Sequence, residues 1–453
     1  MHPRTTSHLV LLLIAVLWAV LVVHSLEYVG RFMFHTFLIS VRWLQILFIA
    51  LTLYMGTMML LSVRRRPVSP PAREARPVVS VLIPAKDEER VIEGTLRSLA
   101  GLDYHVGGRR RFEVLVIDDG STDGTPRILR RLTRELGVRV VRTPIGGRGK
   151  AAALNIGTRH ARGDLLAVFD ADARVAPDYL QRLIAALDDP RIGGVQGRRL
   201  FYNAGQNLLT RMQDDEFAIM QTRLQRVRQA TGAFVTFAGN GLLVRREALR
   251  AAGGWNEDAL TEDIDLSLRL YLAGWRIRYC DDAVVWEEAV GGVRALVRQR
   301  TRWFEGALRC LGEQLPALLV GRVPLRVRLD MLFFLAGLLL ATLALLTTYT
   351  YALIGLAGAV VLFLGIPQEV MAAISAFFTI ALVAAVVDER GWSPLAVGGV
   401  LLRSAIFSLH RVLVVPLAIL RYVHAAVTGR VDWAKTAHLG EMSAEAAGDV
   451  RLS

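Results

Sequence analysis

Lysine and cysteine are scarce in this sequence of 453 residues, and two common nucleotide-binding motifs are missing. Only three of its 54 basic residues are lysines, a bias that indicates a G+C-rich genome. The two cysteines, Cys280 and Cys310, lack the spacing of a metal site, so we expect free thiols. Neither GxGxxG nor a Walker loop occurs, which excludes a dinucleotide-binding fold and a P-loop enzyme.

Charge and apolar residues are distributed unevenly along the chain. It is 53% hydrophobic with a net charge of +13, yet no nucleic-acid-binding motif accompanies the charge, so we expect no nucleic-acid partner. Arginine clusters at 64–66 and 322–328 flank a central segment of ordinary charge, which predicts that this segment is cytosolic. Apolar runs that approach or fall short of the ~20 residues needed to cross a bilayer lie outside it, at 9–23, 43–63, 331–349 and 369–387.

These patterns predict a multi-pass membrane protein. We expect six parts: an N-terminal transmembrane region of two helices (1–66), a Pro-rich linker (67–77), a cytosolic domain (78–290), interfacial helices (291–328), a C-terminal transmembrane region of about four helices (329–427) and a cytosolic tail (428–453). The C-terminal helices are expected near 330–349, 352–366, 369–387 and 398–420. An even number of helices places Arg421, Arg430 and Lys435 on the cytosolic side, in agreement with the charge bias.

Strands and helices alternate four times in the predicted cytosolic domain. Strands are predicted at 78–83, 112–117, 138–141 and 165–169, with Pro84 ending the first, and helices at 88–99, from 126, and at 150–159. This alternation predicts an α/β fold with a mainly parallel sheet covered on both faces, flanked by transmembrane and interfacial helices. Ligands bind at the carboxyl ends of such strands, where four acidic residues lie: Asp118, Asp119, Asp170 and Asp172.

Asp170 and Asp172 follow the fourth predicted strand as an i, i+2 pair. In extended backbone such a pair faces one side, where two carboxylates hold Mg²⁺ or Mn²⁺, and the ion in turn binds diphosphate oxygens. The alternative is a pair of solvated loop aspartates. The position directly after a buried strand favours the metal site.

Thr261, Glu262 and Asp263 open a helix predicted at 262–273. Thr261 is a plausible N-cap and acidic residues suit a helix N-terminus, so capping alone is one explanation. The functional explanation makes Asp263 a general base that takes a proton from an acceptor hydroxyl.

Gln299, Arg302, Trp303 and Gly306 share one narrow face of a predicted helix, at ~100° per residue. Arg302 would neutralise a leaving diphosphate, and Trp303 would stack on a sugar. A basic interfacial helix is the alternative. It explains the arginines of this segment but neither Gln299 nor Trp303.

A basic, glycine-rich loop from Gly146 to Lys150 enters the helix predicted at 150–159. Loops of this kind bind phosphate. Lys150 is one of three lysines in an arginine-rich chain, which favours a role for a compact point charge at this position.

Taken together, these segments resemble the family 2 glycosyltransferases with a GT-A fold, and among them the membrane-integrated synthases. The resemblance covers roughly residues 78–310. It is carried in order by VSVLIPA (79–85) with Glu88, DDGS (118–121), GK (149–150) with ALN (153–155), DAD (170–172), VQG (195–197), GNG (239–241), TED (261–263) and QRTRW (299–303). Lys86 and Asp87 depart from the family, where many members carry Tyr-Asn, so the role of Lys86 is open.

The resemblance implies a role for each matching residue. The uridine pocket would be lined by Pro84, Ala85, Glu88 and Asp119. The nucleotide sugar would be contacted by Lys150 and Asp170, and the metal held by Asp172 with Asp170. Asp263, beside Glu262, would be the base of an inverting displacement that gives a β-linked product. The donor pocket would be closed by Gln299, Arg302 and Trp303, and the acceptor would be met by Gly239, Asn240 and Trp303.

Two acceptors are compatible with the resemblance. Polysaccharide synthases are similar at 261–265 and 299–303, whereas bacterial diacylglycerol β-glucosyltransferases are similar at 239–241 and 302–306. We favour transfer to a growing β-linked polysaccharide, with glycolipid synthesis from UDP-glucose and diacylglycerol as the alternative. A polymer needs a polar exit path, which Arg403, His410 and Arg411 would line unless they lie at the membrane interface.

An inactive membrane scaffold is the alternative from another class. Asp170, Asp172, Asp263 and Arg302 are all intact, which argues against it. A soluble nucleotidyltransferase would share the sheet and the metal aspartates but would lack the 299–303 segment and the apolar helices. The predicted partners are therefore a UDP-sugar donor, a polysaccharide or lipid acceptor, and membrane lipids.

Overall fold

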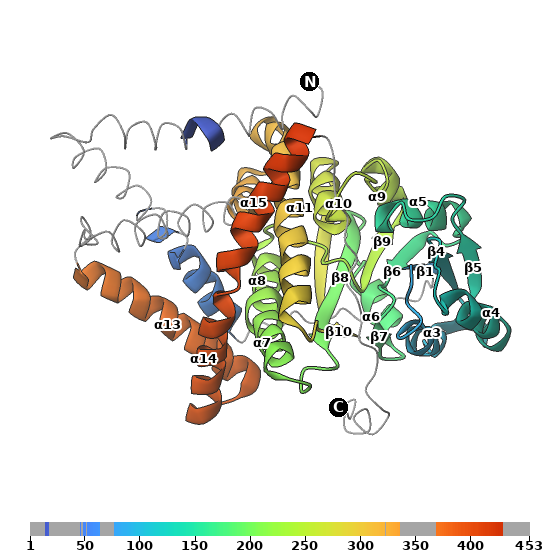
Figure 1. Cartoon of the computed structure of the whole chain (residues 1–453), viewed down its shortest axis with the longest axis horizontal. Coiled ribbons are helices and arrows are strands. Elements are labelled where there is room, and N and C mark those ends of the chain that lie inside the picture. Colours follow the sequence, from blue (N-terminus) through green and yellow to red (C-terminus); the bar gives the residue numbers. More distant parts are fainter. Residues whose placement is uncertain are drawn as a thin grey trace.

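The computed structural model describes residues 14–17, 46, 49–50, 52–63, 77–321, 323–335 and 368–428. Most of the first apolar run, of the linker and of the run 331–349 lies outside these residues, as do the helix expected near 352–366 and almost all of the tail. The described part holds an α/β domain with long helices gathered on one side of it (Figure 1).

An eight-stranded sheet forms the centre of the domain, in the order β5-β4-β1-β6-β9-β8-β10-β7 (Figure 1). Its strands are β1 (Val79–Ala85), β4 (Phe112–Asp118), β5 (Arg139–Arg142), β6 (Leu165–Val168), β7 (Arg174–Val175), β8 (Ile192–Phe201), β9 (Leu242–Arg245) and β10 (Arg276–Glu287). β1 pairs in parallel with β4 and β6, β4 with β5, and β8 with β10, whereas β9 and β7 run antiparallel to their neighbours. The predicted mainly parallel sheet is confirmed, and a separate hairpin pairs β2 (His105–Val106) with β3 (Arg109–Arg110).

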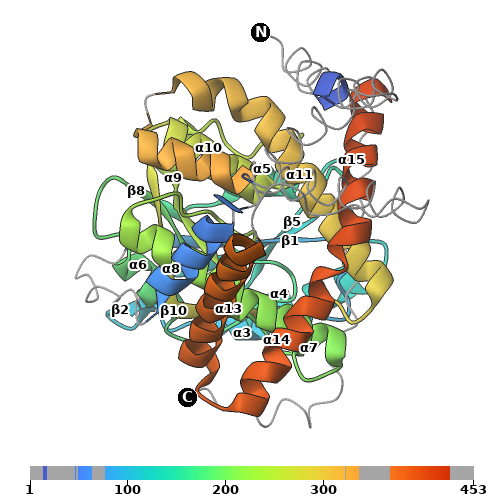
Figure 2. The ribbon, with the colours of Figure 1, turned by 90° about the vertical axis from the view of Figure 1, so that its left-hand side faces the viewer.

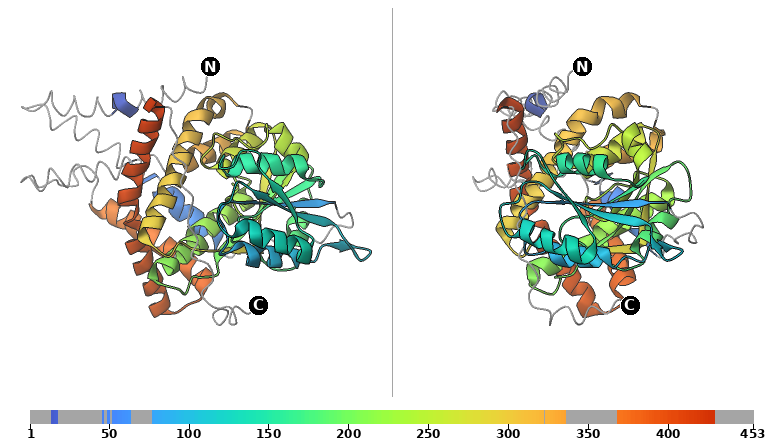
Figure 3. Two further views of the ribbon diagram at one scale, coloured as in Figure 1. Left: turned by 45° about the vertical axis from the view of Figure 1, so that its right-hand side comes forward. Right: turned by 90° about the vertical axis from the view of Figure 1, so that its right-hand side faces the viewer.

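Helices cover both faces of the sheet (Figure 3). One face packs against α3 (Ile92–Ala100), α4 (Thr125–Leu136) and α6 (Tyr179–Ala185); the other packs against α5 (Lys150–His160), α9 (Arg246–Ala251) and α10 (Glu262–Leu272). Val81 and Ile83 of β1 belong to the first layer and Leu82 to the second, because successive side chains of a strand face opposite sides. Cys280 and Cys310 are buried free cysteines, as expected.

Two predicted boundaries in the first strand–helix unit differ from the structure. β1 continues through Pro84 to Ala85. β6 pairs with β1 only as far as Leu82, so at Pro84 no hydrogen bond to β6 is lost because proline lacks an N–H. α3 begins at Ile92 instead of Glu88. The backbone N–H of Glu88 donates to Thr125 Oγ1 (2.7 Å), which holds this residue in a turn ahead of the helix.

Further helices lie on the side of the sheet that faces the viewer in Figure 2. They are α7 (Leu208–Glu216), η1 (Phe217–Gln221), α8 (Thr222–Thr231), α11 (Val293–Val320), α13 (Gln368–Arg390), α14 (Pro394–Ser408) and α15 (Arg411–Thr428). In the described ranges, one segment is long and apolar enough to cross a membrane, Pro394–Thr428, and Thr52–Ser62 is a shorter apolar helix. The helix expected at 398–420 is broken by a turn at Leu409 and His410, so α14 and α15 are separate helices.

A buried cluster of charges joins α13 to the domain. The Glu389 carboxylate accepts hydrogen bonds from Arg198 of β8 and from Arg223 (3.2 Å) and Arg226 (3.0 Å) of α8, and Arg223 also pairs with Asp388 at 2.8 Å. The side chains of Arg223 and Arg226 are 0% and 1% exposed. α13 therefore meets the domain with its C-terminal end.

We predict that Glu389→Gln lowers the free energy of unfolding by about 3 kcal/mol, because removing one partner of a buried ion cluster leaves its arginines uncompensated. Thermal unfolding of the protein in detergent micelles measures the effect. Glu247→Gln, an exposed position on α9, is the control and should melt like the wild type. Equal melting of the Glu389 variant and the wild type would show that the cluster contributes nothing.

Candidate active site

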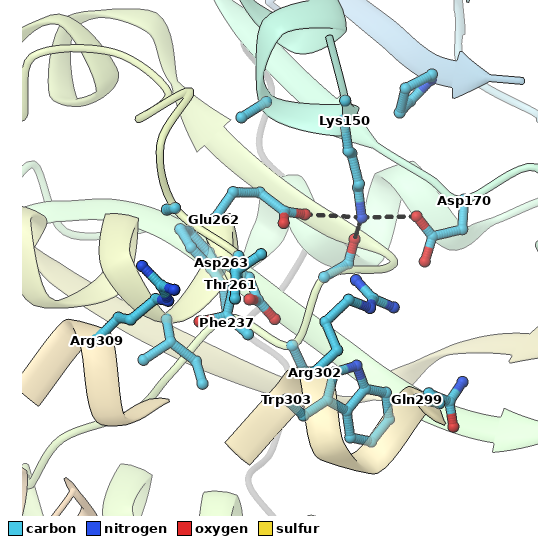
Figure 4. Close-up of a pocket in the computed structure, with 18 of the residues that line it drawn as sticks. Lys150, Asp170, Phe237, Thr261, Glu262, Asp263, Gln299, Arg302, Trp303 and Arg309 are labelled. Carbon is cyan, nitrogen blue, oxygen red and sulfur yellow. Dashed lines mark hydrogen bonds and ion pairs between the residues drawn. The ribbon is translucent and has the colours of Figure 1, made fainter. Parts of the chain in front are cut away.

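A cavity of about 1440 Å³ opens at the carboxyl ends of β1, β4 and β6 and extends to the last turn of α15. Thirteen of the fourteen site residues expected from the sequence line it: Pro84, Ala85, Glu88, Asp119, Lys150, Asp170, Asp172, Gly239, Glu262, Asp263, Gln299, Arg302 and Trp303. The fold therefore brings together motifs that are up to 219 residues apart in the chain. Figure 4 shows Lys150 and Asp170 on one side, with Gln299 and Trp303 opposite them.

Lys150 is the charge centre of the cavity. It begins α5 after Gly149, whose φ of 93° favours glycine. Its ammonium lies 2.7 Å from Asp170 Oδ1 and 2.9 Å from Glu262 Oε1, and it donates to the Gly239 carbonyl at 2.8 Å (Figure 4). Burial alone would lower the pKa of Lys150, but the two carboxylates outweigh burial and raise that pKa well above its ordinary value.

Asp263 lies beside this centre on the first turn of α10. Burial and the neighbouring Glu262 carboxylate raise the pKa of Asp263 to about 6, against the opposing charge of Lys150. Gly239 has a φ of +80°, and a Cβ at this position would lie 3.3 Å from Asp263 Oδ2. Glycine at this position therefore avoids a close contact with the Asp263 carboxylate. Thr261 is the N-cap residue of α10, but its side chain makes no capping hydrogen bond; Glu262 and Asp263 lie in the first turn, where acidic residues suit the helix N-terminus.

The backbone from Asp170 to Asp172 is a turn, and our expectation of an extended pair is wrong. The Ala173 N–H donates to the Asp170 carbonyl at 3.2 Å, which closes the turn directly after β6. The two carboxylates still line the same cavity, but their surroundings differ: Asp170 pairs with Lys150, and Asp172 Oδ2 accepts from the Glu288 N–H at 2.8 Å.

These two carboxylates suit a divalent cation whose coordination is completed by the diphosphate of a substrate. Within the residues that the structure describes, no group of three or more His, Cys, Asp or Glu side chains is arranged to hold a metal by itself. Mg²⁺ is commonly bound by one or two carboxylates together with substrate phosphates and water. Asp170 and Asp172, at the wall of a cavity with room for a nucleotide, match that requirement.

Asn240 does not line the cavity, contrary to our expectation of an acceptor contact. It is fully buried, its Oδ1 accepts from the Asp170 N–H (3.1 Å), and its Nδ2 donates to Glu287 (2.9 Å). Gln196 donates to the Asn240 carbonyl at 2.8 Å, which ties β8 to the same loop. These contacts fix the position of Asp170 from behind, so the motifs at 195–197 and 239–241 act on the site through the backbone.

Asp119 orders the glycine-rich loop next to the cavity. Its carboxylate accepts from Thr143 Oγ1 at 3.0 Å and from the Gly149 N–H at 3.1 Å. Gly120 and Gly146 approach so closely that a Cβ on either would lie 2.8 Å from the other's backbone. The loop is thereby held at the cavity entrance, directly ahead of Lys150.

α11 presents the predicted face to the cavity. Gln299, Arg302 and Trp303 line it together, and Gly306 packs so tightly on α10 that a Cβ would lie 2.5 Å from Thr261 Cγ2. Arg300 lies over the Trp303 ring, with its guanidinium carbon 4.5 Å from the ring centre, and pairs with Glu216 at 2.6 Å. The indole is therefore held by a cation that is itself fixed by an ion pair.

Arg199 and Glu287 also line the cavity and were missed in the sequence. Arg199 Nε donates to Glu287 at 3.0 Å, and its charge interacts with Asp170 and Asp263. These two residues lie on β8 and β10, 88 positions apart, and no local motif marks either of them. Only the pairing of the two strands reveals the contact.

The sheet order and the carboxylates gathered at its edge define a glycosyltransferase with a GT-A fold. A model of the glycosyltransferase-like family 2 matches residues 76–306, and the chain belongs to this family. The resemblance expected from the sequence is confirmed.

Relatives within the family differ in their products. A beta-monoglucosyldiacylglycerol synthase of Nostoc sp. is 38% identical over 299 residues, which cover 65% of this chain and 63% of the relative. A poly-beta-1,6-N-acetyl-D-glucosamine synthase of Staphylococcus aureus is 32% identical over 232 residues, 50% of this chain and 54% of the relative. The chain thus spans less than two thirds of these relatives.

Among solved structures, a mannosyltransferase of Pyrobaculum calidifontis in complex with GDP-mannose and Mn²⁺ is similar in fold. The two structures superpose with a TM-score of 0.53 at 25% sequence identity. The likeness covers 78% of this chain and 99% of the mannosyltransferase chain, which supports the GT-A assignment beyond the catalytic motifs.

We predict that kcat/KM for glycosyl transfer falls about tenfold per pH unit below pH 6, because a general base must be deprotonated in the free enzyme. The pKa of about 6 sets this limit, since the carboxylate of Asp263 is lost as pH falls through it. Asp263→Asn should cost on the order of 10³-fold in kcat while UDP binding is retained. Asp258→Asn, an exposed carboxylate at the cavity rim, is the control; an unchanged rate for Asp263→Asn would remove Asp263 as the base.

Proposed function

We propose that this protein is an inverting glycosyltransferase that moves a hexose from a UDP-sugar to a hydroxyl of a membrane-borne acceptor. The observation that carries the proposal is the meeting of Lys150, Asp170, Glu262 and Asp263 with the 299–303 segment in one cavity. In this cavity, Lys150 and Asp170 can contact the donor, the buried carboxylate of Asp263 has a raised pKa, and the indole of Trp303 forms an aromatic wall.

Asp263 takes the proton of the acceptor hydroxyl, and that oxygen then attacks the anomeric carbon of the donor. The bond from that carbon to the diphosphate breaks as the new bond forms, and UDP leaves with the electron pair. Lys150 and Arg302 line the same cavity and offset the charge that develops on the leaving diphosphate. Attack from the side opposite the leaving group turns an α-linked donor into a β-linked product.

Asp172 and Asp170 would hold Mg²⁺ or Mn²⁺, which supplies charge neutralisation at the diphosphate when bound. The Mn²⁺ in the mannosyltransferase of similar fold supports a divalent ion. Asp119, with Pro84, Ala85 and Glu88, would form the wall beside the nucleotide base.

A lipid is the acceptor that the site supports best. Arg403 pairs with Asp215 at 2.6 Å and Arg411 lies 3.8 Å from Glu216, so these arginines contact α7 and do not line the cavity as an exit path. The glucosyldiacylglycerol synthase relative is a glycolipid enzyme by name and matches 65% of the chain. We therefore place glycolipid synthesis ahead of the polysaccharide product that the sequence alone favoured.

A growing β-linked polysaccharide is the second candidate acceptor. The similarity to the poly-N-acetylglucosamine synthase favours it, as does the resemblance of the segments 261–265 and 299–303 to polysaccharide synthases. Either acceptor requires attachment to the bacterial plasma membrane, which the apolar helices at both ends of the domain support.

We expect detergent-purified protein to release UDP from UDP-glucose when Mg²⁺ or Mn²⁺ and diacylglycerol are supplied, and to add a single sugar to the lipid. UDP-N-acetylglucosamine and GDP-mannose serve as competing donors, and products are sized by mass spectrometry. A long polymer formed without lipid would replace the glycolipid proposal with the polysaccharide one. Absence of turnover with every donor and acceptor would favour the inactive scaffold.

Asp172→Asn should abolish the metal-dependent part of UDP binding, because the amide oxygen still accepts from the Glu288 N–H while the negative charge is gone. Calorimetric titration of UDP with and without Mn²⁺ measures this directly. Binding to the variant that still strengthens with Mn²⁺ as in the wild type would place the ion elsewhere.

A further inference from the structure

α14 and α15 are attached to the catalytic domain along their whole length. Arg403 of α14 pairs with Asp215 of α7, and Arg421 of α15 pairs with Glu305 of α11 at 3.1 Å. α15 also buries Val414, Ala418 and Tyr422, and it packs along α11, as Figures 1 and 3 show. A helix whose two ends and middle contact a globular domain runs across the surface of that domain. The segment Pro394–Thr428 is thus apolar enough to cross a bilayer, yet it packs against the catalytic domain.

The opposite face of this segment is apolar and exposed. Its large residues recur at helical spacing and are 42% to 77% exposed: Leu402, Ile406, Leu409, Leu413, Leu417, Leu420 and Val427. A helix with one apolar face and with arginines paired behind it suits the plane of a membrane interface. The apolar helices Thr52–Ser62 and α13 reach the domain on the same side (Figure 2), which identifies the occupant of this face as the bilayer.

The last turn of α15 has a second role, because it is also a wall of the active-site cavity. Ala425, Ala426 and Thr428 line the cavity, together with Phe334 of the helix 325–335. The guanidinium carbon of Arg228 lies 4.9 Å from the Phe334 ring centre, and Arg309 and Glu313 line the cavity as well, so small, aromatic and charged side chains share this wall. One continuous cavity therefore connects the bilayer-facing helix with the general base.

We infer that a lipid acceptor enters the cavity from the bilayer over the last turn of α15, between Ala426 and Phe334, with its acyl chains left in the leaflet and its hydroxyl directed to Asp263. This inference rests on the proposed glycosyltransferase function and adds the route of the acceptor.

Ala426→Trp tests the route, because an indole at this position narrows the lipid end of the cavity and leaves the donor end unchanged. We expect kcat/KM for diacylglycerol to fall at least tenfold while UDP binding and the slow hydrolysis of UDP-glucose stay within twofold of the wild type. Leu420→Trp is the matched control: it lies on the same helix, is 65% exposed and does not line the cavity, and it should keep full lipid transfer.

UDP binding reports whether the Ala426→Trp variant is folded. If this variant does not bind UDP, Ala426→Leu is tested in its place. Full lipid transfer by a variant that binds UDP would overturn the route and leave the proposed function intact. A wild-type protein that makes polymer and ignores lipid would overturn both.

Discussion

The ion pairs of Lys150 are the constraint on which the rest of the site depends. Asp170, Glu262 and Asp263 come from two separate elements and converge in a cavity where their negative charges would repel one another. A single ammonium reaches two of them and the Gly239 carbonyl, so it fixes the end of β6, the start of α10 and the loop before β9 relative to each other. It also limits how far the pKa of Asp263 rises, which keeps that carboxylate ionised at neutral pH.

A second set of buried contacts holds this arrangement from behind. The side chains of Asn240 and Gln196 form hydrogen bonds with backbone groups of the loops that carry Asp170 and Gly239. The ion pair of Arg199 and Glu287 joins β8 to β10 next to the indole of Trp303. Backbone hydrogen bonds restrain the same loops: the Gly241 N–H donates to the Val168 carbonyl at 3.0 Å and the Ala173 N–H to the Asp170 carbonyl at 3.2 Å. Buried polar groups that are fully hydrogen-bonded position such loops more precisely than apolar packing does.

The helices beside the domain link the chemistry to the membrane. α11 carries Gln299, Arg302 and Trp303 on its cavity face and packs along α15 on another, while Glu389 at the end of α13 lies among three arginines of the domain. The catalytic face is therefore held at a fixed distance from the apolar helices. This arrangement suits an enzyme whose acceptor stays in the bilayer.

The sequence by itself determined the α/β alternation, the order of the strands that end in acidic residues, and nearly all of the cavity-lining residues, because local periodicity and short motifs carry that information. Tertiary structure alone decided that Asp170 and Asp172 form a turn, that Asn240 supports Asp170 from behind, and that Arg199 meets Glu287. It also decided that the C-terminal end of α13 contacts the domain and that α15 packs along α11, since the composition of an apolar helix does not specify its neighbours. Those outcomes depend on contacts between residues far apart in the chain, which no local pattern encodes.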